Sequence, residues 1–281
     1  HGYSNEYNLN LSGGGEKAGF RISGGYREET GQVIGQYGQR FTTRLNLDYY
    51  VSHRIKVMAD FAFTYNKNRR NTESLLYNSL LMMPNMSIYK QDIYGNNTDE
   101  YYAMLDWENK NTLQSVMNGK KNPIAVGNLA EYYTENYSVS PQITLEYNLL
   151  GLEDNETRLL YRGMVNLNAS TASGSVFTPA ALSMGDWDAE EKNKSQANDS
   201  KSLGFTTRHE LVFTPYLGSK DHYLTSNFRF EMNTSSGNSQ NAAAVGLPTG
   251  NISSSTVGSK PKNANTSKWE SRGVNFVWQA H

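Results

Sequence analysis

Residues 7–26 read YNLNLSGGGEKAGFRISGGY, and this stretch decides the fold. On its first arm Tyr7 and Leu9 alternate with Asn, and on its second arm Phe20 and Ile22 alternate with Arg and Ser. Alternation of period two on both sides of a glycine-rich break predicts a β-hairpin. One face of this hairpin carries large apolar groups and the other carries Asn, Ser and Arg, and the rest of the chain repeats this arrangement.

The same alternation recurs in seven further segments, which predict seven more strands. They are residues 40–51, 55–66, 137–149, 159–169, 204–216, 222–233 and a segment beginning near Lys268. The predicted strands have about 10 to 14 residues, whereas strands of globular proteins usually have five or six. Long strands of alternating character are typical of membrane β-barrels.

The connections between the predicted strands alternate between short and long. Tight turns are predicted at 13–17, 52–54, 153–156 and 218–221, and long loops at 67–134, 170–201 and 234–266. Antiparallel neighbours then place all short turns at one end of the sheet and all long loops at the other. Outer-membrane barrels show this asymmetry, with short periplasmic turns and long outer loops.

The longest connection, residues 67–134, is expected to contain short helices. Asn71 and Thr72 predict the N-cap of a first helix that continues through Leu80 and ends before Pro84. Residues 112–118, followed by a glycine, predict a second helix. A loop of this length is uncommon in a compact domain and is usually functional.

Composition excludes several classes of protein. Only 37% of the residues are hydrophobic, the mean hydropathy is −0.67, and no apolar run approaches the roughly 20 residues of a transmembrane helix. The net charge of −1 argues against a nucleic-acid partner held by bulk charge. The chain has no cysteine, so it has neither a disulfide framework nor a thiolate metal site.

Alternation alone does not distinguish a membrane barrel from a soluble β-sandwich, which also has one apolar face. Strand length, the loop asymmetry and aromatic residues near strand ends favour the barrel. These aromatic residues are Tyr7, Tyr26, Tyr49, Tyr65, Tyr137, Tyr147, Phe213 and Tyr223. An open sheet cannot span a bilayer, because its edges would leave backbone groups unpaired. About nine strands, the last one cut short, therefore predict one segment of a larger barrel.

Several motifs in this order resemble a known family. Residues 7–14, followed by Glu16 and Lys17, and the continuations ISGGY at 22–26 and ETGQVI at 29–34 resemble the early barrel hairpin of SusC/RagA-like TonB-dependent outer-membrane transporters. So do RLNLDYYVSHRIKV at 44–57, MPN at 83–85 with the loop after it, and NPIA at 122–125. The resemblance covers most of the first 170 residues.

The resemblance implies an all-β, antiparallel transmembrane barrel, of which this chain is a segment of about nine strands from a total of 22. It implies an N-terminal plug with a TonB box, neither of which is recognisable in residues 1–281. It also implies that residues 67–134 form a long extracellular loop. The implied partners are a SusD-like surface lipoprotein that acts as a lid, the TonB-ExbB-ExbD complex acting through the plug, and outer-membrane lipid.

No motif in the sequence predicts catalysis. The five histidines are scattered, without a metal-ligand spacing such as HExxH, and no GxSxG nucleophile elbow is present. We therefore predict a protein that is not an enzyme, with no catalytic residue, cofactor or metal. The acidic residues 92–100 offer oxygen ligands that calcium accepts, but their spacing departs from an EF-hand, and a solvated loop is the preferred interpretation.

Two sets of residues are candidates for binding. Aromatic faces stack on sugar rings and carboxylates bind hydroxyl groups, so the long loop offers Tyr89, Tyr94, Tyr101, Tyr102, Asp106 and Trp107 as substrate ligands. The alternative is that these residues pack the loop against the barrel or contact the lid. The polar strand face offers Arg21, Arg44, Asp48, Asp60 and Glu146, which would contact a plug or hydrate the lumen.

The predicted function is TonB-dependent import of oligosaccharides or peptides across the bacterial outer membrane. A soluble or surface β-sandwich that binds glycans remains one alternative, and a passive porin-like channel remains another. The substrate is not predicted, because it is recognised by loops that vary within such a family.

Overall fold

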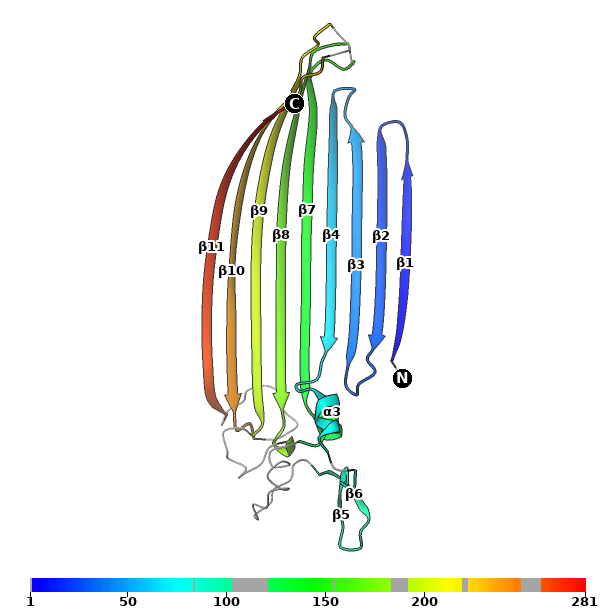
Figure 1. Cartoon of the computed structure of the whole chain (residues 1–281), viewed down its shortest axis with the longest axis vertical. Coiled ribbons are helices and arrows are strands. Elements are labelled where there is room, and N and C mark those ends of the chain that lie inside the picture. Colours follow the sequence, from blue (N-terminus) through cyan, green and yellow to red (C-terminus); the bar gives the residue numbers. More distant parts are fainter. Residues whose placement is uncertain are drawn as a thin grey trace.

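Nine long strands form one antiparallel sheet in the computed structural model, which describes residues 2–82, 84–102, 121–153, 155–182, 192–218, 222–248 and 259–281 (Figure 1). The sheet order is β1-β2-β3-β4-β7-β8-β9-β10-β11. The bounds are β1 (Tyr3–Gly14), β2 (Ala18–Thr30), β3 (Tyr37–Tyr50), β4 (Ile55–Arg69), β7 (Glu131–Leu150), β8 (Arg158–Thr178), β9 (Lys194–Thr214), β10 (Ser226–Val245) and β11 (Lys260–Ala280). Among the described residues no second sheet packs on this one, which excludes the β-sandwich.

The opening hairpin forms as the alternation predicts. β1 pairs with β2 so that Tyr7 lies opposite Tyr26 and Leu11 lies opposite Ile22, with residues 15–17 as the turn. Because side chains of a strand point alternately to the two faces, this register places all the apolar groups of both strands on one face. The same rule extends across the sheet, since each strand continues the register of the one before.

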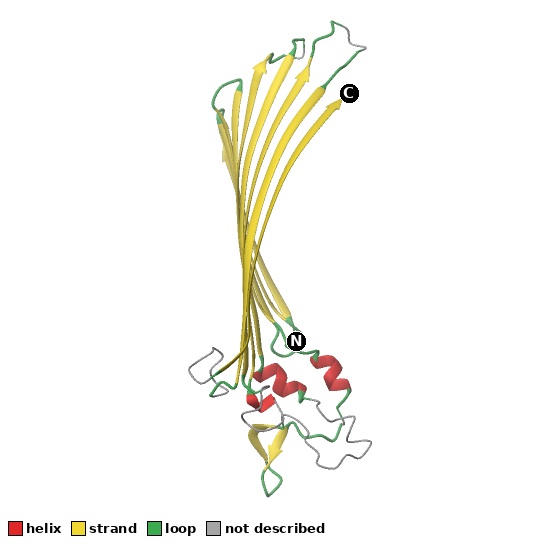
Figure 2. Cartoon of the chain, turned by 90° about the vertical axis from the view of Figure 1, so that its left-hand side faces the viewer, coloured by secondary structure: helices red, strands yellow, loops and turns green. Residues whose placement is uncertain are grey.

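None of the residues that the structure describes covers the apolar face. Leu9 is 74% exposed and Ile143 is 58% exposed, although both lie in the middle of long strands. A continuous exposed apolar surface of this kind marks contact with a membrane or a partner. The sheet is twisted and curved in the way expected for part of a barrel wall (Figure 2).

An aromatic row marks the edge of the apolar band. Tyr7, Tyr26, Phe41, Tyr65 and Tyr137 lie directly opposite one another on five neighbouring strands. Along β7, the band runs from Tyr137 to Tyr147, about 33 Å at the usual rise per residue. With strands tilted by about 40°, this corresponds to an apolar band about 25 Å tall, the height found in outer-membrane barrels.

The last five strands are much longer than the sequence pattern predicts. They have 20 or 21 residues each, whereas β1–β4 have 12 to 15. The prediction of long loops at 170–201 and 234–266 is therefore wrong, and the connections reduce to 179–193 and 246–259. These strand extensions are rich in Ser, Asn, Thr and Ala on both faces, so they show no apolar alternation, while backbone pairing continues regardless.

The connection between β9 and β10 is longer than predicted, whereas the connections at 170–201 and 234–266 are shorter than predicted. β9 ends at Thr214 and β10 begins at Ser226, so residues 215–225 replace the predicted four-residue turn at 218–221. The three longest connections, 70–130, 179–193 and 246–259, still all lie at the other end, together with the shorter β2–β3 connection at 31–36 (Figure 1). We call these two ends the short-turn end and the outer-loop end.

The excursion of residues 70–130 contains α1 (Leu75–Leu80), a small hairpin of β5 (Tyr89–Gln91) and β6 (Asn97–Tyr101), and α3 (Pro123–Leu129). The N-cap of α1 is Ser74, which makes no side-chain capping bond, so the predicted cap at Asn71 and Thr72 is wrong. The sequence analysis predicted neither the β5–β6 hairpin nor the helix α3. The predicted helix at 112–118 lies outside the described residues.

A small hydrophobic core at the outer-loop end anchors these helices to the sheet. It consists of Leu75, Ala125, Val126, Ala130 and Leu182, the last from the 3-10 helix η1 (Ala180–Leu182) after β8. Both views place the helices at this end (Figures 1 and 2).

The fit between α3 and the β2–β3 connection depends on glycine. Gly35 has a φ of +81°, and a Cβ there would stand 2.5 Å from the Gly127 carbonyl oxygen. Glycine at 35 therefore avoids both a strained backbone and a clash, and it allows the connection to pack directly on α3.

Candidate functional site

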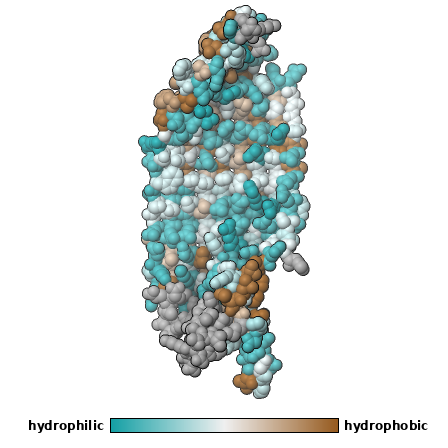
Figure 3. Space-filling model, viewed as in Figure 1, coloured by the Kyte–Doolittle hydropathy of each residue, from teal (hydrophilic) through white to brown (hydrophobic). Residues whose placement is uncertain are grey.

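The polar face of the sheet holds the candidate site, and we call it the inward face. It is largely hydrophilic (Figure 3). Near the short-turn end, one registered row of side chains alternates in charge across five neighbouring strands. From β4 to β10 the row reads Lys56, Glu146, Arg162, Glu210 and Arg229. Opposite charges at directly opposed positions stabilise a sheet.

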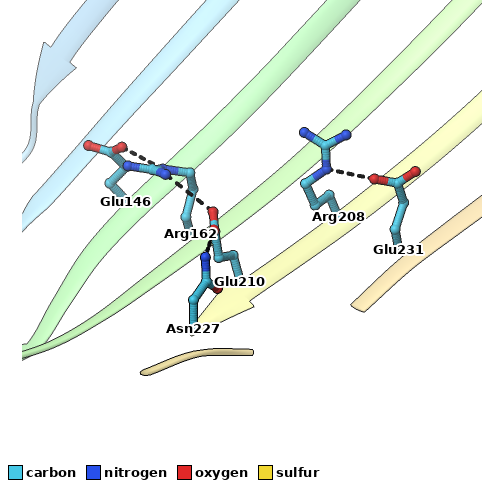
Figure 4. Close-up of polar contacts among 6 residues, drawn as sticks. All are labelled: Glu146, Arg162, Arg208, Glu210, Asn227 and Glu231. Atoms are coloured by element: carbon cyan, nitrogen blue, oxygen red, sulfur yellow. Dashed lines mark hydrogen bonds and ion pairs between the residues drawn. The ribbon is translucent and has the colours of Figure 1, made fainter. Parts of the chain in front are cut away.

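Arg162 is the centre of this charged row. Its Nε donates to Glu146 at 2.7 Å and its second guanidinium nitrogen donates to Glu210 at 3.2 Å (Figure 4). Asn227 donates to the other oxygen of Glu210 at 2.6 Å. The Glu210 side chain is only 14% exposed, so these donors compensate for the partial loss of its hydration. Arg162, Glu146, Glu210 and Asn227 therefore form one hydrogen-bonded cluster across β7–β10.

A second ion pair lies one row away, where Arg208 donates to Glu231 at 2.7 Å (Figure 4). On β3 and β4, Lys56 pairs with Asp48 at 3.1 Å, and Asp60 accepts a hydrogen bond from Asn46. The short-turn half of the inward face is therefore charged across most of its width.

The structure places all five residues predicted for the polar face, Arg21, Arg44, Asp48, Asp60 and Glu146, on the inward face. It joins Asp48 and Glu146 to basic partners. Arg21 and Arg44 have no ion-pair partner among the described residues, which leaves two cations directed away from the sheet. Their role in contacting a plug stays a prediction.

Over β7–β10, the outer-loop half of the inward face has a different chemistry. A groove of about 500 Å³ lies over these strands, on the outer-loop side of the aromatic row. Most of its inward side chains are neutral hydrogen-bonding groups: Tyr132, Thr134, Asn136, Asn198, Ser200, Ser239 and Asn241, with Arg70 at the edge. Asp199, at an outward position of β9, also lines the groove. The Oδ1 of Asn241 is buried and has no hydrogen-bond partner among the described residues.

The predicted loop aromatics divide into two groups. Tyr89 and Tyr101 stack with ring centroids 5.1 Å apart, and the Tyr101 hydroxyl accepts a hydrogen bond from Asn128 at 2.9 Å. Tyr94 lies apart in the β5–β6 turn and is 82% exposed, and Tyr102 is 43% exposed. Asp106 and Trp107 lie outside the described residues. Substrate binding by this set stays a prediction.

NPIA at residues 122–125 has a structural explanation. Asn122 caps α3 by accepting hydrogen bonds from the backbone of Ile124 and Ala125, and Pro123 occupies the first helical turn. The Asn122 amide also donates to the Ile88 carbonyl at 2.9 Å, which ties the start of α3 to the β5–β6 hairpin.

In the acidic stretch 92–100, Asp92 and Glu100 bind partners within the β5–β6 hairpin. Asp92 accepts hydrogen bonds from the backbone of Tyr94 and Asn96 and from the Asn96 side chain, and these donors lower the pKa of Asp92. Glu100 pairs with Lys90 at 2.8 Å, which lowers the pKa of Glu100. Within the described ranges, no three His, Asp or Glu side chains gather in a group able to hold a metal.

Comparisons with known proteins bear on this architecture. Over the described residues, no helix has the length and apolar character needed to cross a membrane. No protein-family model matches the chain. The chain is 34% identical over 103 residues to TonB-dependent receptor P39 of Formosa agariphila, a match that covers 36% of this chain and 10% of the receptor.

Solved structures match over almost the whole chain. Structures of the RagAB peptide transporter, and of the RagAB peptide importer in its closed-closed and open-open states, superpose with TM-scores of 0.67, 0.68 and 0.69. Each match covers 99% of this chain at 14% identity and 29–30% of the matched chain. At that identity the likeness shows the fold.

The resemblance to SusC/RagA-like TonB-dependent transporters is confirmed. The sheet matches a segment of the β-barrel in those transporter structures. The relatives are named as a receptor and a transporter, which agrees with the prediction of a protein that is not an enzyme. The chain spans about a third or less of the length of the relatives it matches.

Sequence reasoning missed the residues at the centre of the charged row. Arg162 and Glu210 were not among the predicted site residues, and neither was Arg208. The signal is the strand register, which places Glu146 opposite Arg162. A bulge at 148–150 shifts this register next to the 151–157 connection, so the turn alone does not determine the pairing. The neutral groove was missed because its residues lie in the strand extensions that the pattern predicted to be loops.

Proposed function

We propose that this barrel segment lines the solute path of a TonB-dependent importer that carries oligosaccharides across the outer membrane. The observation that carries the proposal is the neutral groove on the outer-loop half of the inward face. Amide and hydroxyl side chains match the many donors and acceptors of a sugar. The aromatic pair of Tyr89 and Tyr101 adds rigid flat surface at the same end.

Peptides are the second candidate solute, because the solved relatives are described as a peptide transporter and importer. Peptides carry charged termini, which are bound best by charge-assisted hydrogen bonds. Among the side chains that line the groove on the inward face, Arg70 is the only charged one in the described part of the chain. The neutrality of the groove therefore favours oligosaccharides over peptides.

The two ends of the sheet suit two kinds of partner. A SusD-like lipoprotein lid would cover the outer-loop end, where the β5–β6 hairpin and the helices extend beyond the ends of the strands. A plug coupled to TonB-ExbB-ExbD would dock against the charged short-turn half. Acidic groups of such a plug would find cations at Arg21 and Arg44, which have no ion-pair partner within the described residues.

Uptake of labelled solutes by intact cells tests the proposal. We expect uptake of a neutral oligosaccharide pool to fall on the order of tenfold in the double variant Asn198→Ala/Asn241→Ala, since each lost hydrogen bond weakens binding by about 1 kcal/mol. Asn5→Ala, on the outward face of β1, serves as the control and should leave uptake unchanged. If these cells take up peptides but no oligosaccharide, the oligosaccharide assignment is wrong.

Energy dependence separates active import from the porin-like alternative. Collapse of the proton-motive force with a protonophore should abolish uptake into cells in which the protein is the sole route. Uptake that continues at an unchanged initial rate after this treatment would identify a passive pore.

A further inference from the structure

The outward face carries a groove that solute import does not use. It has a volume of about 750 Å³ and crosses β7–β11. Two registered rows of outward side chains form its walls, and the backbone of the row between them, including Ser202 and Gly237, forms its floor. The wall nearer the apolar band consists of Val139, Ala169, Leu203, Ser236 and Glu270, and the outer wall of Tyr137, Thr171, Lys201, Asn238 and Lys268.

The groove exists because of the sizes of these side chains. Ala169, Thr171 and Ser236 are short, whereas Tyr137, Leu203 and the two lysines project from the sheet around them. On β4 and β7 the same row carries the aromatic residues Tyr65 and Tyr137. The change from rings to small residues and lysines occurs from β8 onward.

The groove lies at the outer boundary of the apolar band. Its outer wall is the direct continuation of the aromatic row, because Tyr137 lies opposite Thr171 and Thr171 lies opposite Lys201. Leu203 is 49% exposed just inside this boundary. Aromatic rows of this kind lie at the depth of lipid headgroups, so the groove is at that depth as well.

Two cations face the groove without an internal partner. Lys201 and Lys268 are exposed and lie on either side of Asn238, so their backbones are about 10 Å apart at the usual strand spacing. Neither forms an ion pair with any residue that the structure describes. Of the nearby carboxylates, Glu270 pairs with Arg272, and Asp199, two residues from Lys201, makes no ion pair with it.

We propose that this groove binds the headgroup of a phosphorylated glycolipid of the outer leaflet. Lys201 and Lys268 would bind its phosphate, the hydroxyl and amide groups of Thr171, Ser236 and Asn238 would bind its sugar, and an acyl chain would lie along Val139 and Leu203. Phosphate fits the two lysines because lysine binds it as a point charge. The outer wall is mostly polar, and the wall nearer the apolar band is apolar at Val139, Ala169 and Leu203, which matches the two parts of such a lipid.

Native mass spectrometry of the protein extracted from its own membrane tests the site. We expect the unchanged protein to retain one phosphorylated glycolipid, and the variant Lys201→Gln/Lys268→Gln to lose at least about four-fifths of it. The control is Lys67→Gln, on the outward face of β4, where Lys67 lies opposite Glu135 and outside the groove. It should retain the lipid fully.

A second measurement keeps the test independent of folding. Lys201→Arg/Lys268→Arg should restore retention, and all variants should show the same heat-dependent gel mobility as folded barrels. In mixed micelles, the unchanged protein should bind purified phosphorylated glycolipid and bind its dephosphorylated form at least fivefold more weakly. Equal retention by the Gln variant, or equal binding of the dephosphorylated lipid, would overturn the proposal. Failure here leaves the import proposal untouched, because the two sites lie on opposite faces.

Discussion

Over β7–β10, the two halves of the inward face share one backbone and differ in chemistry. The short-turn half carries the alternating row from Lys56 to Arg229, in which the Arg162 guanidinium lies between two carboxylates. The outer-loop half carries mainly amides and hydroxyls over these strands, whereas over β1–β3 it also carries charged residues such as Arg27 and Glu29. Strand register produces both surfaces. It places side chains from neighbouring strands in straight rows, so residues of similar character on several strands gather into one surface.

The contrast indicates two kinds of contact. Fixed charges at set positions suit a folded partner with complementary charges, and they favour one orientation of that partner. Neutral donors and acceptors suit a solute that must bind and then leave, because each such contact is individually weak. The charged half therefore suits stable contact with a folded partner, and the neutral half suits transient contact with a solute.

Filling the neutral groove should have the largest effect. A Cβ at Gly174 would stand 3.9 Å from its nearest neighbours, so Gly174→Trp fits the strand and its indole would project into the groove. Loss of two or three solute hydrogen bonds should lower oligosaccharide uptake on the order of 10- to 100-fold. The measurement is the initial rate of uptake by cells.

The matched control places the same ring on the other face. Gly24 lies on the outward face of β2, and a Cβ added there would have no neighbouring atom within 4 Å, so Gly24→Trp adds an indole to the lipid side. Uptake should stay within about twofold of the unchanged protein. If both tryptophans reduced uptake equally, the groove would not be the solute path.

Breaking the charged row should act on stability. Arg162→Met removes the donor shared by Glu146 and Glu210 and should lower the free energy of unfolding by about 2 kcal/mol, because two partly buried carboxylates lose a partner. Arg208→Met removes one donor from one carboxylate, Glu231, and should cost about half as much. Urea unfolding of the folded barrel in detergent measures both. Equal costs would show that the central position of Arg162 has no energetic consequence.

Much of this arrangement could be predicted from the sequence where one face is apolar. Within the band from Tyr137 to Tyr147, hydrophobic alternation determines the strand, its faces and its register. In the outer-loop extensions of β8–β11 both faces are mostly polar, and nothing in the pattern separates a paired strand from a loop. That is why the extensions of β8–β11, and with them the neutral groove, were missed. The charged row was missed for another reason, since pairing across strands depends on the turn lengths.

The aromatic pair above the neutral half allows a smaller test. Tyr101→Phe removes the hydrogen bond from Asn128 and keeps the ring stacked on Tyr89, so it should destabilise the hairpin by about 1 kcal/mol at most. Tyr101→Ala also removes the stacking and should reduce oligosaccharide uptake more than the Phe variant does. Identical uptake by the two variants would show that the ring itself is not a solute contact.

The smallest expected effect concerns the charges of the outer-loop end, which are used inside the β5–β6 hairpin. Backbone and amide donors lower the pKa of Asp92 below that of an unfolded chain. The stability that Asp92 contributes is therefore complete above the unfolded pKa of about 3.9 and is lost as the pH falls through the lower folded value. Amide exchange at Tyr94 and Asn96 should accelerate below that pH and stay slow at pH 6, while Asp92→Asn should show no such acid step. An acid step retained in the variant would assign it to Glu100, which pairs with Lys90 across the same hairpin.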